Sequence, residues 1–348
     1  MSTTGAQEPL LGAQEQQVKE FPTRGWSDSA KQQSKVTAFR YCFIDGLVKS
    51  EDEVSPYHDL GFTHGAGCYE SVLFRNGQPF QLSDHCKRFI ETSRSIGVPL
   101  PLDCSRLMQA VRSVVSRNNV SDCFVRLCST PGNYGVENAP AVLTPTLVIE
   151  CLPSRLPSVA EIVEGFNLLT AEDDRWARSD IKSCQLLPNI QALRAAQQQH
   201  CDDALFVDSN GNVSQATFAN VFAFINGELH TPPAGPHTGV VPGMLRSLVL
   251  EIGESFGIPV NDHEPLSLWS LSHAEEAFLT STSQLIRPIH TIDGKPVMSV
   301  CGPVTLQIME ELAGRIDAET GGSLPFSSIS EDMKNLMSAG IGEHEEAV

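Results

Sequence analysis

The sequence predicts an α+β fold with mainly antiparallel sheets, and three observations support it. Five segments place Asp-Gly or Asn-Gly between apolar, strand-like runs. These dipeptides suit the positive φ angles of tight hairpin turns. Helical patterns lie between the hairpins without a repeated strand–helix–strand unit, and neither a GxGxxG nor a Walker loop occurs. A length of 348 residues corresponds to roughly two domains.

The expected elements follow the chain in a simple order. The hairpin segments are YCFIDGLVKS, VLFRNGQPFQL, ALFVDSNGNVSQ, VFAFINGELHTP and IHTIDGKPVMSV. Apolar residues recur at helical spacing in five stretches, namely Asp84–Ile96, Cys104–Asn118, Pro188–His200, Gly243–Phe256 and Pro303–Ile316. Ser83 or Asp84 is expected to cap the first helix, and Gly97 is expected to end it.

Composition also predicts how the chain is divided. Residues 152–158 place two prolines among small residues and form the expected linker. It would join a small N-terminal domain over residues 39–151 to a larger C-terminal domain over residues 159–318. Residues 1–38 lack periodicity and are predicted to be a disordered tail, and the acidic residues 319–348 to be a flexible tail.

The net charge of the chain limits the classes of partner that it can bind. A formal net charge of -18 repels phosphate backbones and anionic headgroups, so neither nucleic acid nor membrane is expected as a partner. No stretch approaches the ~20 apolar residues of a membrane helix, and the first residues lack a signal core. The ten cysteines are scattered singly without a CxxC pair, so no metal site is expected. These features predict a cytoplasmic protein.

Lysine usage gives the first candidate for chemistry. The chain has eight lysines, and Lys182 is the only one between Lys87 and Lys295. It lies in RWARSDIKSCQLLPN, beside Ile181 and before an apolar run, at the predicted end of a strand. An amine held in a pocket there becomes a nucleophile able to form a Schiff base. A surface lysine beside Asp180 is the simpler alternative.

Three further features could bind an anion. Gly243 opens a predicted helix whose first backbone N–H groups form a positive end. Ser281, Thr282 and Ser283 follow a predicted strand in FLTSTSQLIRPI and could supply hydroxyl donors. Arg88 lies on the apolar side of its helix near Phe89. Each has a structural alternative, namely a loop glycine, ordinary turn residues and an arginine stem packed on a neighbour.

Together, these motifs resemble the fold-type IV pyridoxal-phosphate enzymes. The segments that carry the resemblance are HDLGFTHGAGCYESVLFRNGQPFQLSDHCKRF, DDRWARSDIKSCQLLPN, VSQATFANVFAFINGELHTPP, GMLRS and FLTSTSQLIRPI. Their order and spacing are similar to those of D-amino-acid aminotransferases, branched-chain aminotransferases and aminodeoxychorismate lyase, over roughly residues 39–316. The resemblance implies a small α/β domain, a larger pseudo-barrel domain and an active site between them in a homodimer.

The resemblance also implies the role of each site residue. Lys182 would be the Schiff-base lysine that moves a proton between the substrate's α-carbon and C4′ of pyridoxal 5'-phosphate. The phosphate would be held by Arg88, the backbone N–H groups of Met244 and Leu245, Ser281 and Thr282. Tyr69, in CYES, matches a substrate-carboxylate contact.

One departure from the family pattern concerns the cofactor ring. The family places a glutamate five residues before the Asn of NVF, where it keeps the pyridine nitrogen protonated. Gln215 occupies that position here. A neutral amide can hydrogen-bond to the ring nitrogen but cannot hold its proton by charge. We therefore expect weak transamination, and a gain in turnover for Gln215→Glu.

Two other departures concern the phosphate and the substrate. Leu245 replaces the family's Thr in the GITR turn, which removes a hydroxyl but keeps the backbone donors. Phe218 adds bulk where the family has a small Gly/Ser-rich run. The segment STPGNYGVENAP, after the strand containing Arg126, lacks the Arg-x-His carboxylate trap of D-amino-acid aminotransferases.

The sequence therefore predicts a pyridoxal-phosphate-dependent class IV aminotransferase. Its expected ligands are a small amino acid, of D or branched-chain type, and a 2-oxo acid. Two alternatives remain open. One is a lyase of the aminodeoxychorismate type, and the other is a cofactor-binding protein with little catalysis. Gln215, Leu245 and the missing trap favour the latter, whereas Lys182 and Arg88 oppose it.

Overall fold

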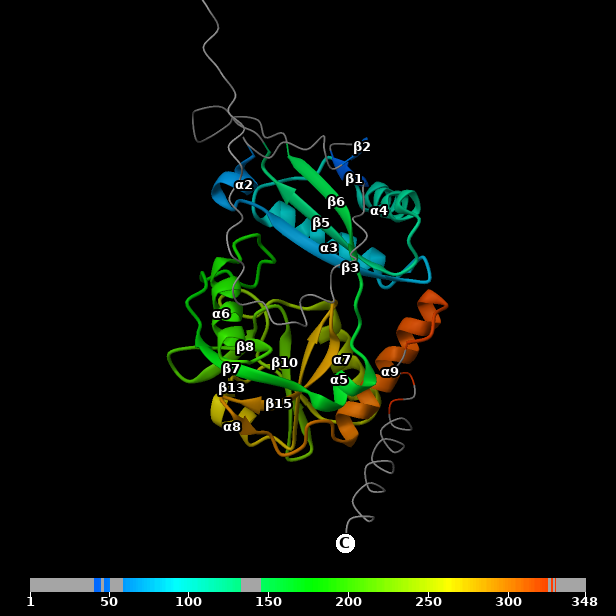
Figure 1. The fold of residues 1–348 in the computed structure, drawn as a ribbon. Helices are drawn as coiled ribbons and strands as arrows, with labels where there is room; N and C mark the ends of the chain where they lie inside the picture. Colours follow the sequence, from blue (N-terminus) through cyan, green and yellow to red (C-terminus); the bar gives the residue numbers. More distant parts are fainter. Residues whose placement is uncertain are drawn as a thin grey trace, which may run out of the picture. The chain divides into compact units, whose positions relative to one another are not determined.

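The computed structural model describes residues 41–44, 47–50, 59–132 and 145–324, together with Ser327 and Ile329. These residues belong to one compact unit that begins at Phe39. The predicted N-terminal tail, the turn at 45–46, the segment 133–144 and most of the predicted C-terminal tail lie outside the described residues. Figure 1 shows the described elements coloured along the chain.

The first half of the described chain builds a six-stranded antiparallel sheet in the order β2-β1-β6-β5-β3-β4. Its strands are β1 (Tyr41–Ile44), β2 (Leu47–Ser50), β3 (Cys68–Arg75), β4 (Gln78–Pro79), β5 (Cys123–Thr130) and β6 (Thr146–Pro153). The accompanying helices are α2 (Leu60–His64), α3 (Leu82–Ser95) and α4 (Cys104–Asn118). Helices α3 and α4 pack on this sheet (Figure 1).

The apolar spacing of α4 explains why it packs there. Its buried side chains recur three or four residues apart and so form one face, comprising Leu107, Ala110, Val111, Val114 and Val115. They join a core with Val72, Val125, Leu127 and Ile149 of the sheet and Phe89 of α3. Burying one such Val, Leu or Phe side chain contributes about 1.5–3 kcal/mol.

The second half of the chain builds a ten-stranded sheet, ordered β12-β11-β10-β14-β15-β7-β8-β9-β13 with β16 paired to β15. Its strands are β7 (Phe166–Glu172), β8 (Asp203–Val207), β9 (Asn212–Ala216), β10 (Asn220–Ile225), β11 (Glu228–His230), β12 (Val260–Asn261), β13 (Leu266–Ser267), β14 (Glu276–Ser281), β15 (Leu285–Ile292) and β16 (Lys295–Pro296). Its helices are α5 (Val159–Glu164), α6 (Leu187–Gln198), α7 (Met244–Ser255), α8 (Leu268–Ser272) and α9 (Pro303–Thr320).

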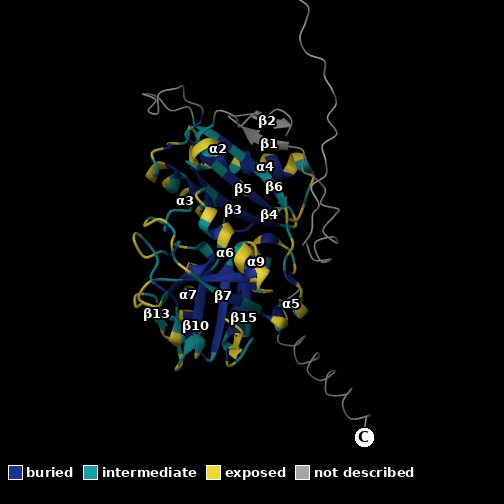
Figure 2. Ribbon diagram, turned by 60° about the vertical axis from the view of Figure 1, so that its left-hand side comes forward, coloured by how far each residue is buried: buried dark blue, intermediate teal, exposed yellow. Residues whose placement is uncertain are grey.

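Most strand pairs in this sheet are antiparallel, while β7 pairs in parallel with β8 and β15, and β11 with β12. Apolar side chains fill a core on each face of the sheet. Figure 2 shows largely buried strands and exposed residues concentrated on the helices and turns. The predicted α+β class with mainly antiparallel sheets is confirmed. The domain division at residues 152–158 stays a prediction, and β6 extends to Pro153 within that segment.

Three of the five predicted hairpin turns have two successive positive φ angles. Asn76 and Gly77 have φ angles of 49° and 72° between β3 and β4. The Asn-Gly pair between β10 and β11 and the Asp-Gly pair between β15 and β16 also have positive φ angles. Two successive positive φ angles match the twist of the flanking strands, which explains why these dipeptides mark the turns.

Helix boundaries differ from the sequence expectation by one to four residues, and two of these differences have a clear structural reason. Helix α3 begins at Leu82 after Gln81, which has φ 51° and makes no side-chain cap, so the predicted cap at Ser83 or Asp84 is wrong. Gly97 closes this helix as predicted, with its N–H on the carbonyl of Arg94. Helix α9 continues past Ile316 to Thr320, whose side chain is again buried.

The start of α9 is fixed by a buried carboxylate. Glu276, at the start of β14, accepts hydrogen bonds from the backbone N–H groups of Val304 (3.1 Å) and Thr305 (2.7 Å). Its side chain lies against Gly302, where a Cβ atom would collide with the carboxylate. The glycine before α9 is therefore required by close packing rather than by its φ angle.

Across the described part of the chain, no helix is both long and apolar enough to cross a membrane. Those same residues contain no group of three His, Cys, Asp or Glu side chains that could share a metal ion.

Candidate active site

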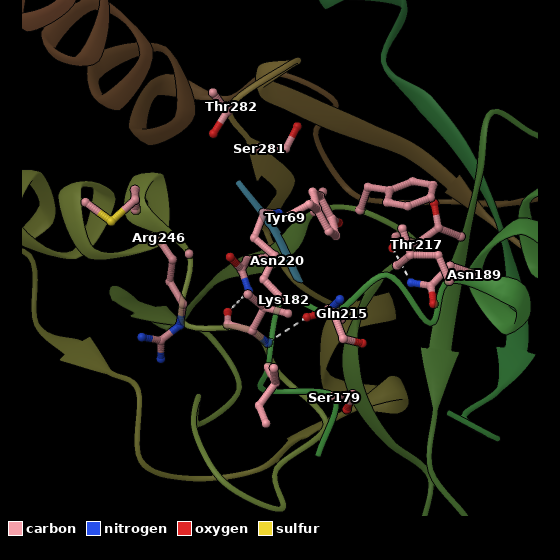
Figure 3. Close-up of a pocket in the computed structure, with 18 of the residues that line it drawn as sticks. Tyr69, Ser179, Lys182, Asn189, Gln215, Thr217, Asn220, Arg246, Ser281 and Thr282 are labelled. Atoms are coloured by element: carbon pink, nitrogen blue, oxygen red, sulfur yellow. Dashed lines mark hydrogen bonds between the residues drawn. The ribbon is translucent and has the colours of Figure 1, made fainter. Parts of the chain in front are cut away.

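One cavity is lined by all eight residues that the sequence predicts to bind cofactor or substrate. Figure 3 labels five of them, namely Tyr69, Lys182, Gln215, Ser281 and Thr282. The walls of the cavity come from β3, α3, the loop before α6, the connection from β9 to β10, the start of α7 and the end of β14. The eight residues are Tyr69, Arg88, Lys182, Gln215, Met244, Leu245, Ser281 and Thr282. Residues from both sheets therefore meet at one site, whereas their individual roles remain predictions.

Lys182 lies in an irregular loop between β7 and α6, so its predicted place at a strand end is wrong. The loop is fixed through its backbone, since the Lys182 carbonyl accepts a hydrogen bond from the Tyr69 N–H at 3.0 Å. Ser183 forms an isolated bridge with Cys68. The Lys182 Nζ lies 4.3 Å from the centroid of the Tyr69 ring. The amine is thus held over an aromatic face.

Arg175 holds this loop in its irregular conformation. Its guanidinium forms a bidentate pair with Asp173, at 2.8 and 2.7 Å, and its side chain is 4% exposed. It also donates to the Ser214 hydroxyl (3.0 Å) and the Gly239 carbonyl (2.7 Å). The sequence prediction missed this residue. The sequence feature that could have revealed Arg175 is its spacing from Asp173, two residues earlier, in the segment that also contains Lys182.

Arg88 lies against a buried carboxylate that the sequence prediction also missed. Its Nε and Nη2 donate to Glu70 at 2.7 and 2.9 Å, and Nη1 donates to the Pro242 carbonyl at 2.7 Å. These bonds use three of five N–H donors and leave two for a ligand. The sequence feature that could have revealed Glu70 is its charge within the otherwise largely apolar run of β3.

The pKa of Glu70 reflects this pairing. Burial raises the pKa of the carboxyl group, but the charge of Arg88 and the nearby imidazole of His85 lower it more. The pKa therefore lies well below its ordinary value, and Glu70 carries a negative charge. His85 Nδ1 lies 3.2 Å from Glu70 Oε1. The pair keeps Arg88 oriented toward the loop that precedes α7.

The start of α7 presents backbone donors to the cavity. Gly243 precedes this twelve-residue helix and supplies no side-chain cap, so the N–H groups of Met244 and Leu245 stay available to a ligand. A Cβ at Gly243 would collide with the Asn220 side chain. The Leu245 side chain is buried in the apolar core, which accounts for leucine at the family's threonine position.

The end of β14 adds hydroxyl donors to the same cavity. The Thr280 Oγ1 is buried and makes no hydrogen bond with any described residue. Ser281 Oγ accepts a hydrogen bond from the Gln284 N–H at 3.2 Å and lies 3.4 Å from Ser283 Oγ, a contact in which either hydroxyl can donate. A buried hydroxyl without a partner beside a helix N-terminus and Arg88 fits a phosphate group. The residues present therefore fit pyridoxal phosphate.

Gln215 lies on β9 and is 4% exposed. Its Oε1 accepts a hydrogen bond from the Val241 N–H at 2.8 Å. The Val241 carbonyl in turn accepts a hydrogen bond from Asn220 Nδ2 at 2.9 Å. Figure 3 shows both bonds beside Lys182. The sequence selected Gln215 but gave no sign of its contact with Val241.

A buried acid lies behind another wall of the cavity. Asp203 accepts hydrogen bonds from the Thr217 hydroxyl (2.5 Å) and the Ala204 N–H (2.7 Å). Burial raises its pKa to about 6, although these bonds act in the opposite direction. Asn189 Nδ2 donates to the Thr217 carbonyl at 2.5 Å (Figure 3). Asp203 therefore supports Thr217 at the cavity wall.

Aromatic side chains form part of the cavity wall near solvent. Trp176 and Phe218 line it while 39% and 42% exposed. Phe218 therefore adds apolar bulk beside the cavity, as expected from the sequence. Arg126, on β5, is partly exposed and pairs with Glu150 of β6. The carboxylate trap was sought in residues 129–140, and most of that segment, from residue 133 onward, lies outside the described residues.

The comparisons with known proteins show the family to which this chain belongs. The family model for amino-transferase class IV matches residues 67–292, and the chain belongs to that family. It is 30% identical over 279 residues to a D-alanine aminotransferase of Listeria monocytogenes, covering 79% of this chain and 95% of the relative. A D-alanine aminotransferase of Staphylococcus aureus is 28% identical over 284 residues, covering 80% and 98%.

Solved structures share the fold. The Escherichia coli branched-chain amino acid aminotransferase matches with a TM-score of 0.74 and 24% identity, covering 82% of this chain and 96% of that chain. A putative 4-amino-4-deoxychorismate lyase from Legionella pneumophila matches with a TM-score of 0.68 and 22% identity, covering 76% and 97%. The predicted resemblance, the fold-type IV architecture and the aminotransferase class are confirmed.

Proposed function

We propose that this class IV aminotransferase uses pyridoxal 5'-phosphate to move an amino group between a small amino acid and a 2-oxo acid. Class IV aminotransferases are pyridoxal-phosphate enzymes. The observation that carries the proposal is that Lys182 shares one cavity with Arg88, the first N–H groups of α7 and the hydroxyl groups of Ser281 and Thr282. The cavity thus combines an amine with donors suited to a phosphate.

The proposed binding roles follow from these donors. Arg88 would contact the phosphate with the N–H groups that Glu70 and Pro242 leave free. Met244 and Leu245 would contribute backbone N–H groups, and Ser281 and Thr282 would contribute hydroxyl groups. The positive end of α7 stabilises an anion at this position.

Lys182 would carry the proton transfer. Pyridoxal phosphate, when bound, supplies an electron-withdrawing ring that stabilises negative charge at the substrate's α-carbon. The Lys182 amine would accept the proton lost from that carbon and later return one, acting as general base and then general acid. Tyr69 lies next to the amine and would contact the substrate carboxylate.

The substrate is proposed only as a class. The Listeria relative is a D-alanine aminotransferase, whereas the Escherichia coli structure is a branched-chain aminotransferase. The assay of amino transfer therefore has to include both D- and L-amino acids. We also propose that the enzyme is a cytoplasmic homodimer with its active site completed by the second subunit, as in the resembling family.

Two alternatives would produce different products from the same cavity. The match to the Legionella structure motivates a lyase that releases pyruvate from aminodeoxychorismate without an amino acceptor. Gln215 motivates a cofactor-binding protein with little turnover, because a neutral amide cannot hold a proton on the ring by charge.

The test is an assay of product formation by the cofactor-loaded protein. It is incubated with D- or L-alanine, glutamate or leucine and either pyruvate or 2-oxoglutarate, and the new amino acid is quantified. The proposal predicts amino transfer that is lost in Lys182→Ala and kept in Lys295→Ala, an exposed lysine outside the cavity. Pyruvate release without an acceptor would favour the lyase, and no product from any pair would favour the binding protein.

A further inference from the structure

The orientation of the Gln215 amide is decided by its neighbour. A backbone N–H can only donate, so the atom that accepts from the Val241 N–H must be the amide oxygen. The amide nitrogen then occupies the other position. It makes no hydrogen bond with the described residues, and it is not among their buried unpartnered atoms. The NH2 group therefore reaches the cavity that Gln215 lines.

The Val241 peptide is itself held in place. Asn220 Nδ2 donates to its carbonyl at 2.9 Å, and Arg175 donates to the carbonyl of Gly239, two residues earlier, at 2.7 Å. Arg175 is fixed by its bidentate pair with Asp173. The donor is thus presented by a network of buried groups, and rotating the amide would place NH2 against the Val241 N–H. Two donors facing each other would lose a hydrogen bond at a buried position.

The described ionisable residues that line the cavity include no acid that could stabilise a cation inside it. The ionisable side chains that line it are Tyr69, Arg88, Arg175, Lys182 and Arg246. None of the described lining residues is an aspartate or glutamate. Arg88 and Arg175 are paired behind the lining with Glu70 and Asp173, so no carboxylate among the described residues faces the cavity to favour a cationic ligand group.

We propose that Gln215 donates a hydrogen bond to the ring nitrogen of bound pyridoxal phosphate and thereby holds that nitrogen unprotonated. This inference rests on the proposed function, which supplies the cofactor. It reverses the role implied for the family's glutamate, which accepts a hydrogen bond from a protonated nitrogen. Gln215 is a catalytic residue in this sense because it contacts the cofactor ring.

The direct test measures the ring nitrogen itself. Protein loaded with pyridoxal phosphate labelled with 15N in the ring is examined by NMR between pH 6 and 9. We expect the resonance of an unprotonated pyridine throughout, and a shift toward the pyridinium position in Gln215→Glu. Gln185→Glu is the matched control, because it adds the same charge to another lining glutamine, and it should shift the resonance much less than Gln215→Glu does.

A second test needs no variant. A cofactor analogue with carbon in place of the ring nitrogen cannot accept the Gln215 hydrogen bond. The wild-type protein should bind it about 2- to 13-fold more weakly than pyridoxal phosphate, the loss expected for one neutral hydrogen bond. Equal affinity, or a protonated nitrogen in the wild type, would overturn the inference while leaving the proposed function standing. Failure to bind pyridoxal phosphate at all would overturn both.

Discussion

The pair between Glu70 and Arg88 gives a sharp prediction for the variant Glu70→Gln. The amide keeps the size of the carboxyl group but removes its charge. Its oxygen can still accept one bond from Arg88, while its NH2 group faces another guanidinium N–H donor. The change therefore replaces a bidentate pair, with contacts of 2.7 and 2.9 Å, by one bond and one repulsive contact.

The expected loss of stability follows from burial. Removing one partner of a buried ion pair costs about 3–5 kcal/mol. The Arg88 side chain is 18% exposed, so water can solvate part of the stranded charge and the lower end, about 3 kcal/mol, is expected. At about 2 °C per kcal/mol, Tm should fall by about 6 °C. Affinity for pyridoxal phosphate should also fall, because Arg88 loses its fixed orientation.

Thermal unfolding followed by circular dichroism measures this loss, and Glu150→Gln is the matched control. Glu150 pairs with Arg126 on the same sheet, but both side chains are partly exposed. An exposed pair contributes at most about 1 kcal/mol, or about 2 °C. Equal melting temperatures for the two variants would refute the claim that the buried pair stabilises the fold.

The pH dependence of this pair has a defined sign. The pKa of Glu70 is lower in the folded protein than its ordinary value of 4.5. Its contribution is therefore present above pH 4.5 and is lost as pH falls toward the lower folded pKa. Wild-type protein should lose more stability than Glu70→Gln on acidification below pH 4.5. Parallel loss in the two proteins would contradict this.

Three further predictions concern single sites. Gly302→Ala should lower the free energy of unfolding by about 1–3 kcal/mol, because the added Cβ would collide with Glu276. Gly314→Ala, within α9, adds a Cβ in open space and should raise stability slightly. Tm measures both changes. Burial raises the pKa of Asp203 from 3.8 to about 6, so the folded state binds its proton more tightly. Stability should fall as pH rises from 3.8 to about 6, and Asp203→Asn should remove that fall in melting profiles. Gly243→Ala should weaken pyridoxal-phosphate binding, measured by equilibrium titration, because its Cβ would displace the start of α7.

Each of these predictions has a contradicting result. A Gly302→Ala protein that melts with the wild type would show that the Glu276 contact can relax without cost. Identical pH profiles for wild type and Asp203→Asn would mean that burial does not penalise the charge of Asp203. An unchanged dissociation constant for Gly243→Ala would remove the start of α7 from the binding site.

The repeating local features of the sequence were sufficient to predict much of the fold. Asn-Gly and Asp-Gly pairs require a backbone that few other residues adopt, so they located the hairpin turns. The apolar spacing of α4 located that helix with its observed limits. The ends of α3 and α9 were harder, because a nonstandard cap at Gln81 and tertiary burial of Thr320 decide them.

The site could be predicted where a residue type itself carries the chemistry. Lys182 was recognisable as an isolated lysine in a motif, and Gln215 as an amide at a family carboxylate position. Glu70 and Arg175 were missed because their importance depends on partners that the fold brings together. The donor orientation at Gln215 depends on Val241, 26 residues away, and no sequence pattern announces that contact.

The most direct test of the proposed chemistry is the location of the covalent cofactor link. Protein loaded with pyridoxal phosphate is reduced with borohydride and digested, and the labelled peptide is identified by mass spectrometry. We predict a single label on Lys182 that disappears in Lys182→Ala and persists in Lys295→Ala. A label on another lysine, or no label despite bound cofactor, would contradict the assignment of this cavity as the active site.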